Sequence, residues 1–259
     1  MSRVPELTAA LWASHRRLDN ATRGMTREQL SGPSYCSEWT IAQVLSHLGS
    51  GVQAMGLRLD AGLAGTEQPS QSEIEAIWAV WDAMTPEDQA EKSLSTDTMF
   101  LQRVDTIPAD QLEGIHISLF GTPADADRLL AVRLSEHAIH TWDIVVMGDP
   151  AATLGADAAV EMIDGLDLIV TYTGKPGHGP GETTVITTDP DRTFRLSAGD
   201  AVSIAPATSG DPPADAVVRL PAEAWIRVVY GRLDAAHTPA SVTSQGIGLE
   251  TLRAMFPGV

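Results

Sequence analysis

The stretch LLAVRLSEHAIHTWDIV, residues 129–145, decides the fold of the first part of the chain. Its apolar residues recur at helical spacing, and the Gly-Asp-Pro at 148–150 stops a helix. The stretch therefore predicts one long, buried helix. Glu136 and His140 lie four residues apart on it, so both side chains project from the same face and can reach one ion.

Further segments carry the three- and four-residue apolar spacing of amphipathic helices. The second of them follows a turn-rich segment, in which we expect Ser37 to cap the helix, and it carries His47. Together these segments predict a helical bundle over the first two-thirds of the chain. They cover residues 6–24, 41–48, 74–84 and 156–172, with weaker periodicity over 86–107.

The pattern changes after the glycine- and proline-rich segment GKPGHGPG, residues 174–181. Short runs rich in β-forming residues and two helical segments follow it. We therefore expect an α+β protein, with a helical bundle over residues 1–174 and a small α/β domain over residues 182–259. The expected strands are 183–188, 194–196, 216–220 and a short one at 241–243, and the helices are 221–230 and 248–256.

Charge and composition exclude several classes of protein. Thirty-four acidic and seventeen basic residues give a formal charge of −17, which repels phosphate backbones and anionic lipid. No apolar run approaches the ~18 residues of a membrane span, and no signal peptide is apparent. The single cysteine, Cys36, cannot form an intramolecular disulfide. We expect a cytoplasmic protein, monomer or homodimer, with no nucleic-acid or membrane partner.

Glu136, His140 and His47 supply the donor types of a catalytic zinc site. Such sites use three protein ligands, among them the two-histidine, one-glutamate set, and keep one position open for water or substrate. The same donors also serve iron, nickel and other divalent metals. The spacing alone leaves open that these side chains are hydrogen-bonded core residues.

Two motifs resemble the signatures of the mycothiol-dependent maleylpyruvate isomerase family. The segment PSYCSEWT at 33–40, followed by AQVLSHL at 42–48, is similar to the first signature, P-x-x-C-P-G-W-T-V-x-D-L-x-x-H-L. The segment EHAIHTWD at 136–143 resembles the second, E-x-x-x-H-x-W-D. Ser37 and Glu38 replace the usual proline and glycine, which we expect to change the turn and not the ligands. The tail, residues 226–233 followed by 242–257, is similar to the family's small sterol-carrier-like C-terminal domain.

The resemblance implies a DinB-like four-helix bundle in which His47, Glu136 and His140 bind a divalent metal, zinc by its donor set. It also implies that a low-molecular-weight thiol, mycothiol, serves as cofactor. Arg232 matches the family's G-R motif and is expected to act at the site, pairing with a carboxylate of cofactor or substrate. A surface arginine is the alternative.

Three further residues stand near the expected ligands in sequence. Trp39 and Trp142 can wall the metal off from water, or simply pack in the core. Asp143 can hydrogen-bond the free ring nitrogen of a ligand or cap the end of its helix.

Other potential ligands and nucleophiles receive plainer interpretations. Cys36 lacks an obvious base beside it and is taken as structural. His137 points ~100° away from Glu136 around the helix, which predicts an outer-shell or surface position. The remaining histidines have no partner identifiable from sequence: His15, His116, His178 and His237.

Together these features predict a metal-dependent enzyme that activates a thiol. The reaction is either S-transfer to a small-molecule electrophile or cis–trans isomerisation of a conjugated oxo-acid such as maleylpyruvate. Two alternatives stay open. The first is a thiol-independent metal-assisted hydrolase or biosynthetic rearrangement enzyme. The second is a non-catalytic protein in which the metal is a structural staple and a small ligand is bound.

Overall fold

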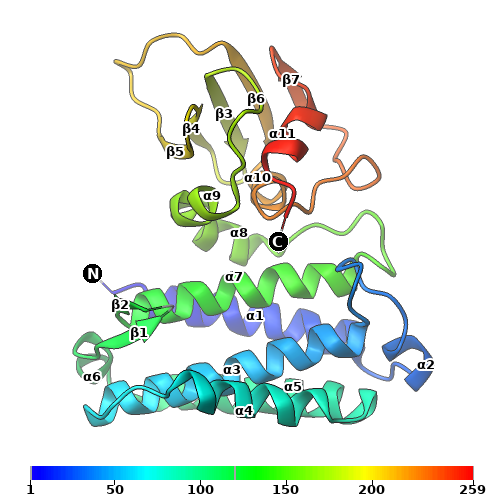
Figure 1. The fold of residues 1–259 in the computed structure, drawn as a ribbon, viewed down its shortest axis with the longest axis vertical. Coiled ribbons are helices and arrows are strands. Elements are labelled where there is room, and N and C mark those ends of the chain that lie inside the picture. The colour runs from blue at the N-terminus through cyan, green and yellow to red at the C-terminus, as the bar shows by residue number, and fades with distance from the viewer. Residues whose placement is uncertain (1, 120, 259) are drawn as a thin grey trace. The chain divides into compact units, whose positions relative to one another are not determined.

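Two compact units make up the chain in the computed structural model, which describes residues 2–119 and 121–258 (Figure 1). The first unit, residues 1–149, is helical, and the second, residues 150–259, contains a five-stranded mixed sheet. The expected α+β class, with a helical part followed by a smaller α/β part, is confirmed. Within the described residues, no helix combines the length and the apolar composition needed to cross a membrane.

Four long helices form the first unit, and each contacts two of the others. The helix α1 packs against α5 and α7, and α3 packs against the same two helices, so α3 and α7 are direct neighbours. The four are α1 (Val4–Thr22), α3 (Ile41–Ala64), α5 (Pro86–Thr106) and α7 (Ala126–Val145). The shorter elements are α2 (Arg27–Leu30), α4 (Gln71–Asp82), α6 (Ala109–Glu113) and the antiparallel pair β1 (Ile117–Leu119) and β2 (Thr122–Ala124).

A capping box fixes the start of α3. Thr40 Oγ1 accepts a hydrogen bond from the Gln43 backbone N–H at 3.2 Å, and the Gln43 side chain accepts one from the Thr40 N–H at 2.9 Å. These bonds satisfy N–H groups that have no partner within the helix. Ser37, the expected cap, lies outside the helix because the chain first closes a turn, in which the Trp39 N–H donates to the Cys36 carbonyl at 2.8 Å.

The core of the first unit fixes α3 against α4 by direct contact at a glycine. Val44 and Leu45 of α3 are fully buried. One turn further, a β-carbon at Gly49 would lie 2.2 Å from the ring of Trp81, which is 2% exposed. Only glycine leaves room for this ring, so any side chain there displaces α4 from α3, two residues beyond His47.

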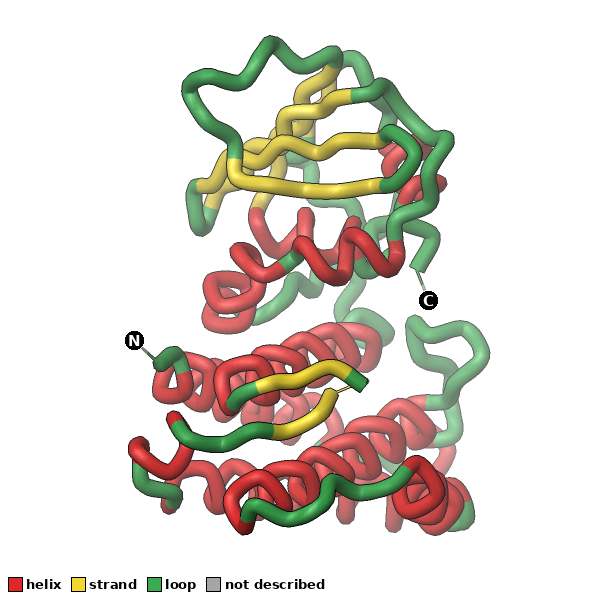
Figure 2. Tube along the Cα trace, turned by 60° about the vertical axis from the view of Figure 1, so that its left-hand side comes forward, coloured by secondary structure: helices red, strands yellow, loops and turns green. Residues whose placement is uncertain are grey.

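The second unit is built on a sheet in the order β5-β4-β3-β6-β7. The central pair β3 and β6 is parallel, and the other pairs are antiparallel. Figure 2 shows these strands side by side, with helices beside them. The strands are β3 (Glu182–Thr188), β4 (Arg192–Ala198), β5 (Val202–Pro206), β6 (Ala216–Pro221) and β7 (Thr243–Gln245). The helices are α8 (Ala156–Met162), η1 (Ile163–Gly165), α9 (Asp167–Thr173), α10 (Ala222–Val229) and α11 (Leu249–Met255).

The observed division of the chain differs from the expected one. It falls between Asp149 and Pro150, so α8 and α9 belong with the sheet and not with the helical bundle. The helix α9 packs against β5, and Thr173 Oγ1 donates to the Val229 carbonyl at 3.1 Å. A β-carbon at Gly174 would lie 2.6 Å from the Val202 side chain. The glycine- and proline-rich segment 174–181 is therefore a turn inside the second unit and not a linker.

Candidate metal centre

Neighbouring helices bring the three predicted metal ligands together. The helix α3 carries His47, and α7 carries Glu136 and His140. Glu136 Oε2 lies 3.0 Å from His47 Nε2 and 3.7 Å from His140 Nε2. Ligands ~2.1 Å from a tetrahedral zinc are separated by about 3.4 Å, so these two distances bracket the required spacing. The donor set and its spacing fit one divalent ion.

The exposure of this group distinguishes it from a closed structural site. The side chains of His47 and Glu136 are each 38% exposed, and that of His140 is 12% exposed. Catalytic metal sites keep an open position beside their protein ligands, and partly exposed ligand side chains leave room for water or substrate there. The His47, Glu136 and His140 group meets this requirement.

Asp143 orients the His140 ring. Its Oδ2 lies 2.9 Å from His140 Nδ1 and accepts a hydrogen bond from the Cys36 thiol, with 3.0 Å between Sγ and Oδ2. The Asp143 carboxylate is fully buried. A carboxylate on one ring nitrogen fixes the tautomer and leaves the other nitrogen free to bind a metal, so Nε2 faces Glu136. Of the two expected roles for Asp143, the geometry selects the hydrogen bond. Cys36 acts here as a hydrogen-bond donor.

The two tryptophans near the ligands differ in their surroundings. The Trp39 ring centroid lies 5.1 Å from that of His47 and 6.1 Å from that of His140. Trp39 is 38% exposed, so it forms a wall between the ligand rings and solvent. Trp142 is 1% exposed and packs edge-on against Tyr35 at 4.8 Å, which makes it a core residue.

The charge state of Glu136 suits metal binding. Burial on its own would raise the pKa of this carboxyl group. The hydrogen bond with His47, together with the electrostatic effects of His140, His47 and Arg133, outweighs burial and lowers the pKa from its ordinary value. Glu136 is therefore ionised at neutral pH, in the form that binds a cation.

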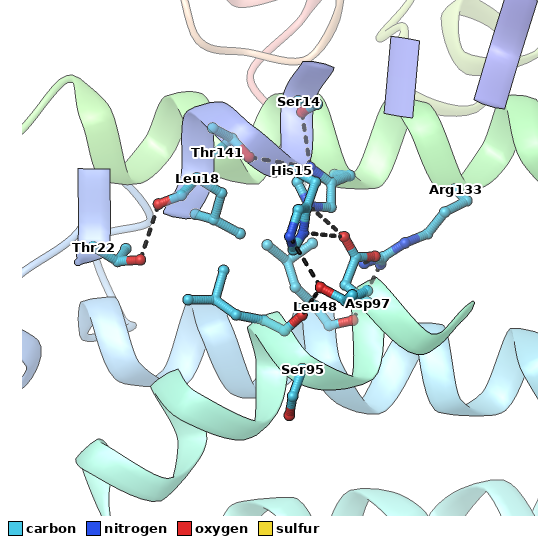
Figure 3. A network of polar contacts seen from close by, with 12 residues as sticks. Ser14, His15, Leu18, Thr22, Leu48, Ser95, Asp97, Arg133 and Thr141 are labelled. Atoms are coloured by element: carbon cyan, nitrogen blue, oxygen red, sulfur yellow. Dashed lines mark hydrogen bonds and ion pairs between the residues drawn. The ribbon is translucent and has the colours of Figure 1, made fainter. Parts of the chain in front are cut away.

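A second group of similar donors lies buried in the bundle, where sequence reasoning assigned no site (Figure 3). Asp97 Oδ2 lies 2.8 Å from His15 Nδ1 and 3.2 Å from His137 Nε2. All three residues are buried, and their donor atoms lie within 4.8 Å of one another, so they qualify as a metal-binding group by composition. Of the two positions expected for His137, the surface one is wrong, because the residue is fully buried, and the outer-shell one stays a prediction. His15, for which sequence identified no partner, is hydrogen-bonded to Asp97 and Thr98.

The positively charged side chain of Arg133 already pairs with the carboxylate of this buried group. Arg133 Nη2 lies 2.6 Å from Asp97 Oδ1, and both side chains are 2% exposed. A divalent ion bound to Asp97 would face the guanidinium charge with little solvent to screen it. We therefore interpret the Arg133, Asp97, His15 and His137 group, called the buried cluster below, as a structural network.

Arg232 belongs to the second unit. It is 7% exposed, its Nη1 donates to the Tyr230 carbonyl at 2.7 Å, and its backbone N–H donates to the Arg227 carbonyl at 2.6 Å. Gly231 precedes it with a φ of 71°, and a β-carbon there would lie 2.4 Å from the Gly258 backbone. The G-R pair thus has a structural reason for its glycine. The role expected of the arginine toward cofactor or substrate stays a prediction.

A four-helix bundle with a half-exposed His47, Glu136 and His140 group, followed by a mixed-sheet domain, defines a two-domain protein of the DinB-like class. Residues 11–145 match the mycothiol maleylpyruvate isomerase N-terminal domain, and residues 157–249 match the C-terminal domain of the same protein. The chain belongs to this family.

Two solved structures share the fold. The crystal structure of the mycothiol-dependent maleylpyruvate isomerase is 16% identical and aligns with a TM-score of 0.66 over 95% of this chain and 94% of that chain. A histidine-to-alanine mutant of that isomerase is 15% identical, with a TM-score of 0.67 over the same shares of the two chains. No curated protein sequence matches the chain.

Proposed function

We propose that this protein is a metal-dependent enzyme that activates a low-molecular-weight thiol for attack on a small electrophilic molecule. The observation that carries the proposal is the open, correctly spaced His47, Glu136 and His140 group. Zinc is the metal that suits two imidazoles and one carboxylate with an open position. The carboxylate is ionised, and Asp143 directs the His140 Nε2 lone pair toward the centre.

When bound, the metal supplies a Lewis acid that lowers the pKa of a thiol, so that thiolate is available at neutral pH. The residues of the chain prepare the place for this chemistry. His47, Glu136 and His140 hold the cation, Asp143 fixes the ring of one ligand, and Trp39 limits the access of water. The chain itself offers no other thiol for the reaction, because Cys36 is its single cysteine and its thiol is engaged as a hydrogen-bond donor to Asp143.

The proposed thiol and electrophile are inferred from the family to which the chain belongs. A solved structure of this fold is described as a mycothiol-dependent maleylpyruvate isomerase. We therefore propose mycothiol as the cofactor, and either S-transfer or cis–trans isomerisation of a conjugated oxo-acid such as maleylpyruvate as the reaction. In this proposal Arg232 pairs with a carboxylate of the cofactor or the substrate.

The proposal is tested on the wild-type protein purified without added metal. We expect about one zinc per chain, as one three-ligand site allows, and turnover of maleylpyruvate only when both zinc and mycothiol are present. Removing zinc with a chelator should abolish turnover, and adding zinc back should restore it. Metal-dependent turnover without thiol would instead support hydrolysis or rearrangement. Bound metal with no exchangeable position and no turnover would support the non-catalytic alternative.

Asp143→Asn tests whether the buried carboxylate acts on the metal through His140. An amide can no longer act as a charged acceptor for both Nδ1–H and the Cys36 thiol, so the basicity of His140 falls. We expect the zinc dissociation constant to rise about 10- to 100-fold, measured by competition with a chromogenic chelator. The control is Asp149→Asn, which makes the same change at the last residue of the first unit. Equal zinc affinity in wild type and Asp143→Asn would contradict the role.

A further inference from the structure

We infer that Arg133 is a positioning residue that fixes α3 against α7 and so sets the separation of the metal ligands carried by these helices. The inference rests on the proposed function, because it concerns the geometry of the same metal centre. Arg133 itself touches none of the reacting groups in that proposal. It acts through the backbone of the residue next to His47.

The contacts of Arg133 join three helices. Its Nη1 donates to the Leu48 carbonyl of α3 at 3.1 Å, and Leu48 directly follows His47. Its Nη2 lies 2.6 Å from Asp97 Oδ1 of α5. Arg133 is 1% exposed, so neither contact competes with bulk water. Figure 3 shows the Arg133 side chain reaching toward Asp97 from α7.

Arg133 lies on the same helix as two of the proposed ligands, Glu136 and His140, so a shift of α7 at Arg133 also moves these ligands. Arg133 lies three residues before Glu136, which is less than one helical turn, and seven residues before His140. A rigid helix carries a displacement at one turn directly to the next. The guanidinium thus connects the α3 backbone beside one ligand to the α7 turn that carries another.

His137 prevents α7 from rotating about this contact. Its Nδ1 lies 2.8 Å from Ser14 Oγ of α1 and 3.2 Å from Thr141 Oγ1, and its Nε2 lies 3.2 Å from Asp97. His137 is the immediate neighbour of Glu136. Thr141 lies on α7 itself, but Ser14 lies on α1 and Asp97 on α5, so rotation of α7 about its axis would break the contacts with Ser14 and Asp97. These two contacts hold the helix in one orientation.

The chemistry of arginine explains why this residue type suits the position. A guanidinium is planar and presents its N–H donors in a fixed fork, so one side chain can bind a carboxylate and a carbonyl in fixed relative directions. The ammonium group of lysine is a compact charge on a flexible stem. Lysine can keep the pair with Asp97, but it does not hold the Leu48 carbonyl in the same geometry.

Arg133→Lys is the first test, with Val104→Ala as matched control. Val104 is a buried residue of α5 and takes part in none of the contacts above, so its truncation loosens the core without removing the connection between α3 and α7. We expect Arg133→Lys to raise the zinc dissociation constant about tenfold and to change the visible absorption of the cobalt(II)-substituted protein, which reports ligand geometry. Val104→Ala should leave both measurements unchanged.

Each other outcome has a definite meaning. Unchanged zinc affinity and cobalt spectrum in Arg133→Lys would overturn the positioning role, and so would an equal change in Val104→Ala. If Arg133→Lys does not fold, the double variant Asp97→Asn with Arg133→Met is tested instead. It removes both charges together and should show the same loss of zinc affinity. Unchanged affinity in that double variant would overturn the role. Wild-type protein that binds no zinc would overturn the proposed function itself.

Discussion

Replacing His47 or His140 with alanine should remove zinc from the purified protein. The proposed centre has only three protein ligands, so each substitution leaves two. Structural zinc sites with four ligands contribute ~10–16 kcal/mol, which makes one ligand worth on the order of 3 kcal/mol, or about a hundredfold in affinity. Elemental analysis of protein purified without added metal should find about one zinc per wild-type chain and almost none in either variant.

His15→Ala is the matched control for this experiment. It is the same substitution in the same bundle, but in the buried cluster, where Asp97 is already paired with Arg133. We expect this variant to keep its zinc. Loss of zinc from His15→Ala together with full occupancy in His47→Ala would place the metal in the buried cluster and refute the assignment made above.

Much of the candidate metal centre could be predicted from the sequence because its geometry is local. Glu136 and His140 share a helical face by their spacing alone, and the apolar pattern around them specifies the helix. The pairing of α7 with α3 is not local. It was predicted only because the signature around His47 resembles that of a known family. In the structure the three side chains lie together.

The buried cluster could not be predicted in the same way. Asp97, His15 and Arg133 are far apart in sequence, and each by itself resembles an ordinary polar residue of a surface helix. One weak signal was available, since Asp97 lies on the same face of its helix as the buried Ser93, Leu101 and Val104. An acid on the apolar face of a helix needs a partner, but its sequence does not identify that partner.

The domain boundary was misplaced for a related reason. Glycines and prolines mark a turn, but they do not say whether the turn joins two domains or two elements of one domain. Residues 156–172 were expected to form one helix, and the structure instead has three helical elements there, α8, η1 and α9. Only the contacts of these elements with β5 and α10 assign them to the second unit. Contacts of this kind leave no pattern within a single helix.

Asp97→Ala should be the most destabilising single substitution in the buried cluster. It leaves the Arg133 guanidinium buried without its carboxylate, and breaking a buried pair in this way costs about 3–5 kcal/mol in the free energy of unfolding. Urea denaturation at pH 7 measures the loss. The double variant Asp97→Ala with Arg133→Met removes the isolated charge and should recover most of the stability. A double variant as unstable as the single one would show that packing, and not charge, sets the cost.

The same carboxylate should make stability depend on pH in the acid range. Burial alone would raise the pKa of Asp97, but Arg133 and His137 of α7 and the hydrogen bond with His15 of α1 hold it well below its ordinary value. Above the unfolded-state pKa of ~3.9 both states are ionised, and the stabilisation is complete. As the pH falls below about 4, the unfolded chain takes up a proton that the folded chain does not, so wild type loses stability. Asp97→Asn lacks this group, and the gap in unfolding free energy between it and wild type should therefore narrow from pH 5 to pH 3. A gap that stays constant would mean that the Asp97 carboxylate is not held in its charged form by the buried cluster.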